Sequence, residues 1–181
     1  MRIAIIPGSI GSNSYNIKMA KYIQERYKDK FNAEILYLKE IPMFSVDDEL
    51  KPPEIIFKYR KIITESDGII FVTPEYNHSI PGVLKNALDW FSRAEMVLNN
   101  KPGMIVGVSQ GVLGTAKAQW HLRQILNSGG IKVITLPANE VFIGKAQDKF
   151  DEEGNFIHQP TIKFLDVVVD RFIQWTNKIN N

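Results

Sequence analysis

Short apolar runs alternate along the chain with longer segments in which apolar residues recur every three or four positions. A short apolar run closed by Gly, Pro or polar residues is typical of a buried strand, and the longer spacing is typical of an amphipathic helix. The pattern predicts strands at residues 2–6, 33–38, 68–73, 104–108 and 131–135. It predicts helices at residues 14–27, 54–65, 81–92, 115–127 and 159–179, and irregular chain at 40–53 and 138–157.

The predicted strands are continuously apolar, as a sheet covered by helices on both faces requires. Strand and helix alternate throughout, which indicates an α/β fold with a parallel, doubly wound sheet in one domain over residues 1–181. Ligands of such sheets bind beyond the carboxyl ends of the strands. The loops after the first, third and fourth predicted strands are therefore the candidate site. In the last helix, the expected buried stripe consists of Phe164, Val167, Val168, Phe172 and Trp175.

Composition excludes several classes of protein. The 181 residues are 44% hydrophobic and 23% charged, as in ordinary soluble globular proteins, and the net charge of +2 gives no reason to expect a nucleic-acid partner. The absence of cysteine excludes disulfides, thiolate metal sites and a cysteine nucleophile. No segment approaches the roughly 20 apolar residues of a membrane span. We therefore expect a cytoplasmic protein without a membrane partner, and we expect no metal site.

The first candidate loop, PGSIGSNSYN at residues 7–16, leads from a strand into a helix. A helix N-terminus exposes unpaired N–H groups and a partial positive charge, which favours a phosphate. Ser9, Ser12, Ser14 and Asn16 add side-chain donors, and Gly8 and Gly11 allow close backbone approach. The loop matches neither the ATPase phosphate loop nor the G-x-G-x-x-G dinucleotide fingerprint. A helix start capped by serine, without a ligand, is the alternative.

The second loop begins the segment TPEYNHSIPGVLKNALDW at residues 73–90, and the third begins SQGVLGTAKAQ at residues 109–119. Aromatic and amide groups at the end of a strand suit a flat heterocycle, and glycines in the third loop again suit close backbone approach. A rigid turn without ligand is the alternative for each loop. His78 is better explained as a structural residue than as a proton donor.

These segments resemble the NADPH-dependent FMN reductase family, flavodoxin-like enzymes that include chromate, quinone and azo-dye reductases. The family motif G-S-x-R-x-x-S-x-N is matched in register by residues 8–16, except that Gly11 stands where the family usually has Arg. The segment at 73–90 matches nearly throughout. The third loop resembles the family's S-x-G-x-x-G stretch and is followed by HLRQIL at residues 121–126.

The resemblance implies a flavodoxin-like five-stranded sheet that binds FMN. The implied ligands of the FMN phosphate are Ser9, Ser14, Tyr15 and Asn16, with Gly11 in the same loop. The implied lining of the isoalloxazine ring is Pro74, Glu75, Tyr76 and Asn77 on one side, and Ser109 and Gly111 on the other. Tyr76 and Asn77 are the candidates for shaping the ring site, and no side-chain acid or base is assigned. The missing arginine leaves the choice between NADPH and NADH open.

The implied activity is hydride transfer from NADPH or NADH, through bound FMN, to a small-molecule electron acceptor. Quinones, azo compounds, metal oxyanions and free flavin are all compatible acceptors. A flavodoxin-type electron carrier and a non-enzymatic phosphate- or flavin-binding module are the alternatives. The resemblance also implies a homodimer or homotetramer, and Trp90, Phe91 and Trp120 are expected to add aromatic surface to two helices; core packing is the alternative for these side chains.

Overall fold

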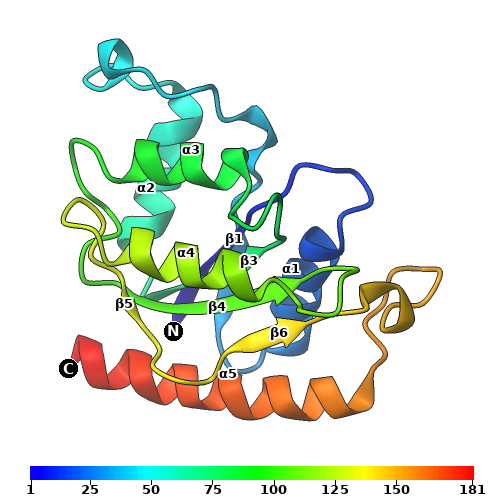
Figure 1. Cartoon of the computed structure of the whole chain (residues 1–181). Coiled ribbons are helices and arrows are strands. Elements are labelled where there is room, and N and C mark those ends of the chain that lie inside the picture. The colour runs from blue at the N-terminus through cyan, green and yellow to red at the C-terminus, as the bar shows by residue number, and fades with distance from the viewer.

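The structure, a computed structural model, describes residues 1–181 and contains one parallel sheet with the strand order β2-β1-β3-β4-β5 (Figure 1). A sixth short strand, β6, pairs with β4 beside the end of β5. The order is that of flavodoxin-like sheets, so the predicted fold class is confirmed. The strands are β1 (Arg2–Pro7), β2 (Asn32–Ile35), β3 (Gly68–Thr73), β4 (Pro102–Val108), β5 (Ile134–Thr135) and β6 (Val141–Ile143).

Helices cover both faces of the sheet (Figure 1). Side chains of a strand point alternately to the two faces, so Ile3 and Ile5 of β1 pack beneath α1 and α5, whereas Ala4 and Ile6 pack with α2, α3 and α4. The helices are α1 (Tyr15–Arg26), α2 (Glu54–Glu65), α3 (Gly82–Phe91), α4 (Ala116–Leu126) and α5 (Gln159–Asn180), and the short 3-10 turns are η1 (Leu38–Glu40), η2 (Val46–Asp48) and η3 (Ala146–Asp148).

The fifth position of the sheet differs from the prediction. Only Ile134–Thr135 of the expected strand at 131–135 joins the sheet, opposite the first two residues of β4. The chain then leaves the sheet at Ala138 and Asn139, whose φ angles of 49° and 68° are left-handed, and returns as β6 opposite Val106–Val108. The prediction of irregular chain at 138–157 is therefore wrong for β6 and η3, and that at 40–53 is wrong for η2.

Two predictions about apolar surface are also wrong. On α5, Phe164 and Val167 are exposed, because the face that packs against the sheet runs through Leu165 and Val169 instead. Apolar residues occupy more than one face of this helix, so their spacing alone did not identify the buried face. Trp90 and Phe91 are fully buried and add no surface, whereas Trp120 is 57% exposed. The core-packing alternative is thus correct for the first two.

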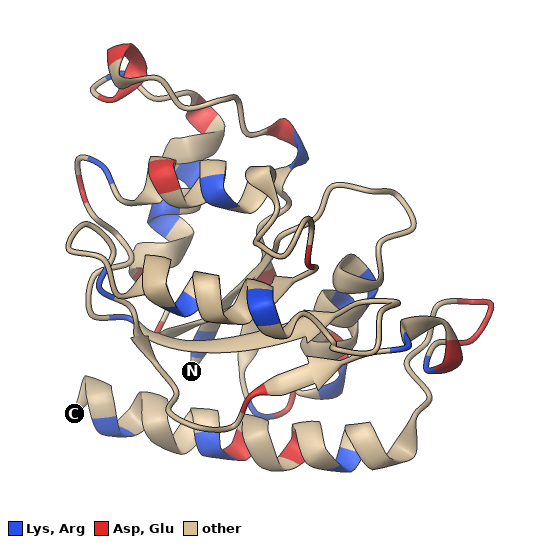
Figure 2. Cartoon of the chain, in the orientation of Figure 1, with Lys and Arg blue, Asp and Glu red and all other residues tan.

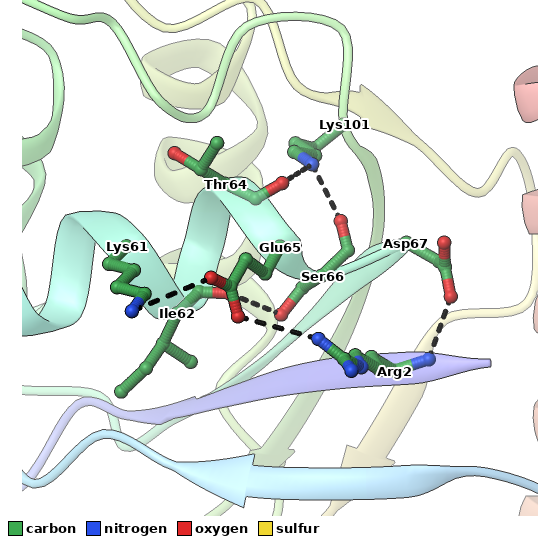
Figure 3. A network of polar contacts seen from close by, with 8 residues as sticks. All are labelled: Arg2, Lys61, Ile62, Thr64, Glu65, Ser66, Asp67 and Lys101. Atoms are coloured by element: carbon green, nitrogen blue, oxygen red, sulfur yellow. Dashed lines mark hydrogen bonds and ion pairs between the residues drawn. The ribbon is translucent and has the colours of Figure 1, made fainter.

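A polar network joins the ends of the strands that lie opposite the candidate loops (Figure 3). The N–H of Arg2 donates to Asp67 Oδ2 at 2.7 Å, and the Arg2 guanidinium pairs with Glu65. The Lys101 ammonium donates to the carbonyl oxygens of Thr64 at 2.8 Å and Ser66 at 2.6 Å, where α2 ends. A cation at a helix C-terminus is favourable. The network therefore holds the beginnings of β1, β3 and β4 together.

Candidate functional site

A cavity of about 640 Å³ lies at the carboxyl ends of β1, β3 and β4. The three candidate loops meet there, and every site residue expected from the sequence lines the cavity except Asn77. The structure adds three residues that were not singled out: Asn13, Val108 and Gln110. Asn13 and Gln110 belong to the candidate loops, so their polar side chains were the available signal. The lining consists of Ser9, Gly11, Ser12, Asn13, Ser14, Tyr15, Asn16, Pro74, Glu75, Tyr76, Val108, Ser109, Gln110 and Gly111.

The loop between β1 and α1 presents a cluster of backbone donors. The N–H of Gly8 donates to Val72 O and the N–H of Ser14 donates to Gly11 O, but the N–H groups of residues 9–13 and of Tyr15 have no acceptor within the protein. Residues 3–17 include no charged side chain, and Figure 2 shows the loop free of both signs of charge. The positive end of the α1 dipole lies behind these N–H groups. Together they form a cradle of neutral donors that can bind an anion.

Ser14 and Asn16 hold this loop in shape. Ser14 Oγ accepts the N–H groups of Asn16 at 3.2 Å and Ile17 at 3.4 Å, which confirms that it caps the helix. The buried Asn16 side chain donates from Nδ2 to Val108 O at 2.9 Å and accepts the Val108 N–H at Oδ1, at 3.3 Å. The side chain thereby acts like a short piece of strand, and it fixes α1 to the end of β4. The structure gives Asn16 a positioning role that the sequence did not indicate.

The second loop contains a tight turn from Tyr76 to Ser79. The two residues exchange N–H···O bonds of 3.0 Å, and the residues between them, Asn77 and His78, have φ angles of 50° and 65°. Two positive φ angles in succession are typical of a type I′ turn. Tyr76 lines the cavity, whereas Asn77 lies at the tip of the turn, outside the lining. The N–H groups of Glu75 and Asn77 have no acceptor within the protein.

Glu75 is the one acidic residue of the lining, and it binds a helix end. Helix α4 begins after Thr115, whose φ of 73° is left-handed and whose side chain makes no capping bond. Glu75 Oε2 accepts the N–H of Ala118 at 3.0 Å, so a carboxylate from the neighbouring loop caps α4. His78 lies 3.6 Å from Glu75, is mostly exposed and does not line the cavity. The other nearby carboxylate in this segment, Asp89, pairs with Lys85 at 2.6 Å.

The third loop rests on the segment that follows β6. Ser109 donates its N–H to Ile143 O at 2.9 Å and accepts the N–H of Ala146 at 3.0 Å. Gly144 is required here, because an added Cβ would lie 2.4 Å from Val112 O. The N–H groups of residues 110–112 have no acceptor within the protein, and Gln110 and Gly111 line the cavity.

The cavity thus combines two kinds of recognition. One end offers neutral donors for a phosphate, and the other offers Tyr76, Pro74 and backbone N–H groups from two loops for the face and edge of a flat heterocycle. On a sheet of this order, that donor set fits a flavin mononucleotide. Fold and cavity together define the class of flavodoxin-like flavoproteins.

Comparison with known proteins specifies the family. The profile of NADPH-dependent FMN reductases matches residues 1–148. The chain is 36% identical over 177 residues to a 2-hydroxy-1,4-benzoquinone reductase from a Burkholderia species, covering 97% of this chain and 96% of the relative. It is 36% identical over 183 residues to the NADH-dependent flavin reductase subunit 2 of Lactobacillus johnsonii, covering 98% of each.

Among solved structures, the flavoenzyme NAD(P)H:(acceptor) oxidoreductase FerB from Paracoccus denitrificans superposes with a TM-score of 0.88 and 30% identity, covering 98% of this chain and 97% of that one. The chain therefore belongs to the NADPH-dependent FMN reductase family, whose members are oxidoreductases. The resemblance found in the sequence is confirmed. None of the helices combines the length and the apolarity that crossing a bilayer would need.

Proposed function

We propose that the chain binds FMN in the cavity at the carboxyl ends of β1, β3 and β4, and that it passes hydride from NAD(P)H to small-molecule acceptors. The observation that carries the proposal is the convergence of three loops whose N–H groups have no protein acceptor on one cavity. When bound, FMN supplies the two-electron chemistry, since it accepts hydride from a nicotinamide and donates it onward. Quinones and free flavin are the first acceptors to test, followed by azo compounds and metal oxyanions.

The phosphate end of the site would use neutral donors only. We assign the phosphate to the N–H groups of residues 9–13 and Tyr15, assisted by the hydroxyls of Ser9 and Ser14. The helix dipole favours the negative charge. Asn16 would act by holding the first loop against Val108, while its second Nδ2 hydrogen stays free for the ligand.

The ring end would work through backbone groups. Pro74, Tyr76 and the N–H groups of Glu75 and Asn77 would contact one part of the ring, and Ser109, Gly111 and the N–H groups of residues 110–112 the other. Fixed N–H dipoles stabilise negative charge that develops during reduction. Tyr76 would shape the site through its ring, and Asn77 through the left-handed backbone of the turn.

We propose that the enzyme uses NADH about as readily as NADPH. Gly11 stands where the family usually has an arginine, and the space around it is open: a Cβ built there meets no atom within 4 Å, and its φ is not left-handed. The first loop therefore lacks the cation that would pair with the 2′-phosphate of NADPH. One of the relatives is itself named for NADH.

We further propose a homodimer whose interface covers the cavity. Exposed apolar side chains gather on the loops around the cavity and on α4, namely Ile10, Tyr76, Val112, Leu113 and Trp120. Trp120→Asp should then convert dimers to monomers in sedimentation velocity experiments, whereas Phe164→Asp, which changes an exposed ring on α5, should leave the dimer intact. If Phe164→Asp dissociates the protein and Trp120→Asp does not, the interface is elsewhere. A homotetramer would require a second interface, for example on the exposed face of α5 that carries Phe164, in addition to the one around the cavity. Cytoplasmic location stays a prediction.

The visible spectrum of the purified protein, followed by anaerobic titration with NADH and NADPH, tests the proposed activity. We expect a yellow protein that is bleached by one equivalent of either nucleotide and reoxidised by a quinone with continued nucleotide consumption. A flavodoxin-type carrier would bind FMN but consume no nucleotide in turnover. A protein that stays colourless after FMN is added would refute the proposal and favour a flavin-free module.

A further inference from the structure

A second cavity adjoins the first on the side of the phosphate cradle. It measures about 420 Å³, within the range of ligand pockets, and shares Ser12 and Ser14 with the first cavity. Its other walls are the outer face of α1 and the turn at residues 153–156. None of the residues at the ring end of the first cavity reaches it. A ligand that extends from the first cavity into the second must therefore pass through the cradle.

Polar groups follow one another along α1 in a definite order. Lys18 is one turn beyond Ser14, about 6 Å along the helix axis, and Lys21 follows on the next turn. Glu25 is about 16 Å beyond Ser14, on the same rise per residue. No carboxylate pairs with the ammonium of Lys18 or Lys21. The cavity thus offers hydroxyls, then two cations that no carboxylate neutralises, then the Glu25 carboxylate. The Lys18 ammonium lies 5.3 Å from the centroid of the Tyr15 ring, and Glu25 pairs with Lys28.

The opposite wall is preformed. Asp151 accepts the N–H of Asn155 at 2.7 Å, and Phe150 pairs with Phe156 across the turn. The turn lies against the Lys18 side chain of α1, since a Cβ on Gly154 would be 2.9 Å from it. A fixed wall lowers the entropic cost of binding.

The cavity floor is aromatic. The ring of Tyr22 meets that of Phe156 edge-on, with 5.3 Å between centroids, and both residues line the cavity. Phe156 is buried, so the partly buried Tyr22 provides the aromatic surface that a ligand would contact. An aromatic floor beside cations suits a nucleobase carried on phosphate. Glu153 stands at the same wall, where a carboxylate can accept hydrogen bonds from ribose hydroxyls.

We propose that this second cavity binds the adenosine phosphate half of FAD, so that the chain accepts a dinucleotide flavin as well as FMN. The inference rests on the proposed FMN site, because the added half of FAD is joined to the flavin's own phosphate. Lys18 and Lys21 would meet the second phosphate, Glu153 the ribose, and the aromatic floor the adenine. A nicotinamide dinucleotide does not fit the same path: its nicotinamide must lie at the ring end, and Glu153 would repel a 2′-phosphate.

Titration of the flavin-free protein with FMN and with FAD, followed by flavin fluorescence, tests the inference. We expect the wild type to bind FAD within about tenfold of FMN, and Lys21→Glu to weaken FAD about tenfold or more, equivalent to about 1.4 kcal/mol. FMN should weaken less than about threefold, because Lys21 lies two turns from the cradle. Lys58→Glu makes the same change of charge on α2, outside both cavities, and should alter neither affinity.

Three results would overturn the inference while leaving the FMN site intact: FAD binding about a hundredfold weaker than FMN in the wild type, equal weakening of both flavins by Lys21→Glu, or a raised KM for NADPH with no change in the ratio of flavin affinities. The last result would mean that the cavity serves the co-substrate. If neither flavin binds, the proposed function fails, and this inference fails with it.

Discussion

Replacing Asn16 by alanine tests whether this residue holds the fold of the site or merely contacts the ligand. The variant loses the buried bonds to Val108 of 2.9 Å and 3.3 Å, and it leaves the Val108 N–H and C=O without those partners. A buried hydrogen bond contributes about 1 kcal/mol, and an orphaned buried group costs about 1–3 kcal/mol. We therefore expect the flavin-free protein to lose about 2–4 kcal/mol of stability on the same scale.

The assay is urea unfolding of flavin-free protein, monitored by far-UV circular dichroism. The midpoint should fall while the m-value stays constant, because the surface exposed on unfolding does not change. Ser12→Ala is the matched control, since this side chain is exposed, lies in the same loop and makes no hydrogen bond within the protein. Unchanged flavin-free stability of Asn16→Ala, together with weaker FMN binding, would refute the positioning role and make Asn16 a simple phosphate ligand.

Gly11→Arg should lower the KM for NADPH about tenfold relative to the KM for NADH, because one charge-assisted contact to the 2′-phosphate contributes a free energy equivalent to about a tenfold change in affinity. An unchanged ratio of the two KM values would place the 2′-phosphate elsewhere. Gly144→Ala should weaken FMN binding about tenfold by displacing the third loop, whereas Gly129→Ala, with no atom within 4 Å of the added Cβ, should have no effect. The Arg26 guanidinium holds the pKa of Asp166 below its usual value of 3.8, so this carboxylate stabilises the fold above about pH 5 and loses that effect as the pH falls below 3.8. The difference in Tm between wild type and Asp166→Asn should accordingly shrink between pH 7 and pH 3, and a constant difference would contradict the ion pair's role.

The sequence predicted the arrangement of the sheet and the edge that carries the site. Buried parallel strands such as β1 and β3 are continuously apolar, and this signal is local. The carboxyl ends of the strands then identify the candidate loops without any knowledge of side-chain contacts. The spacing of glycine and serine in the first loop predicted the anion-binding end of the site, since both residue types favour a helix start that binds anions.

What the sequence did not reveal depends on partners far apart in the chain. Asn16 and Val108 are separated by 92 residues, and Glu75 and Ala118 by 43. The sequence shows the residue types of Asn16 and Glu75 but not their distant partners. Both side chains were therefore assigned to the ligand. In the folded chain, the Asn16 side chain fixes α1 to the end of β4, and the Glu75 carboxylate fixes the second loop to the start of α4. Much of the polarity around the cavity therefore serves to hold backbone N–H groups in place.

The broken edge of the sheet has a function in this arrangement. β5 pairs with only the first two residues of β4, so it supports the end of β4 that lies away from the third loop. The left-handed residues Ala138 and Asn139 instead bring β6 opposite the carboxyl end of β4, where Ile143 accepts the N–H of Ser109. This bond fixes Ser109 next to Gln110 and Gly111, which line the cavity. The break between β5 and β6, which made the strand prediction at 131–135 wrong, thus helps to position the ring end of the site.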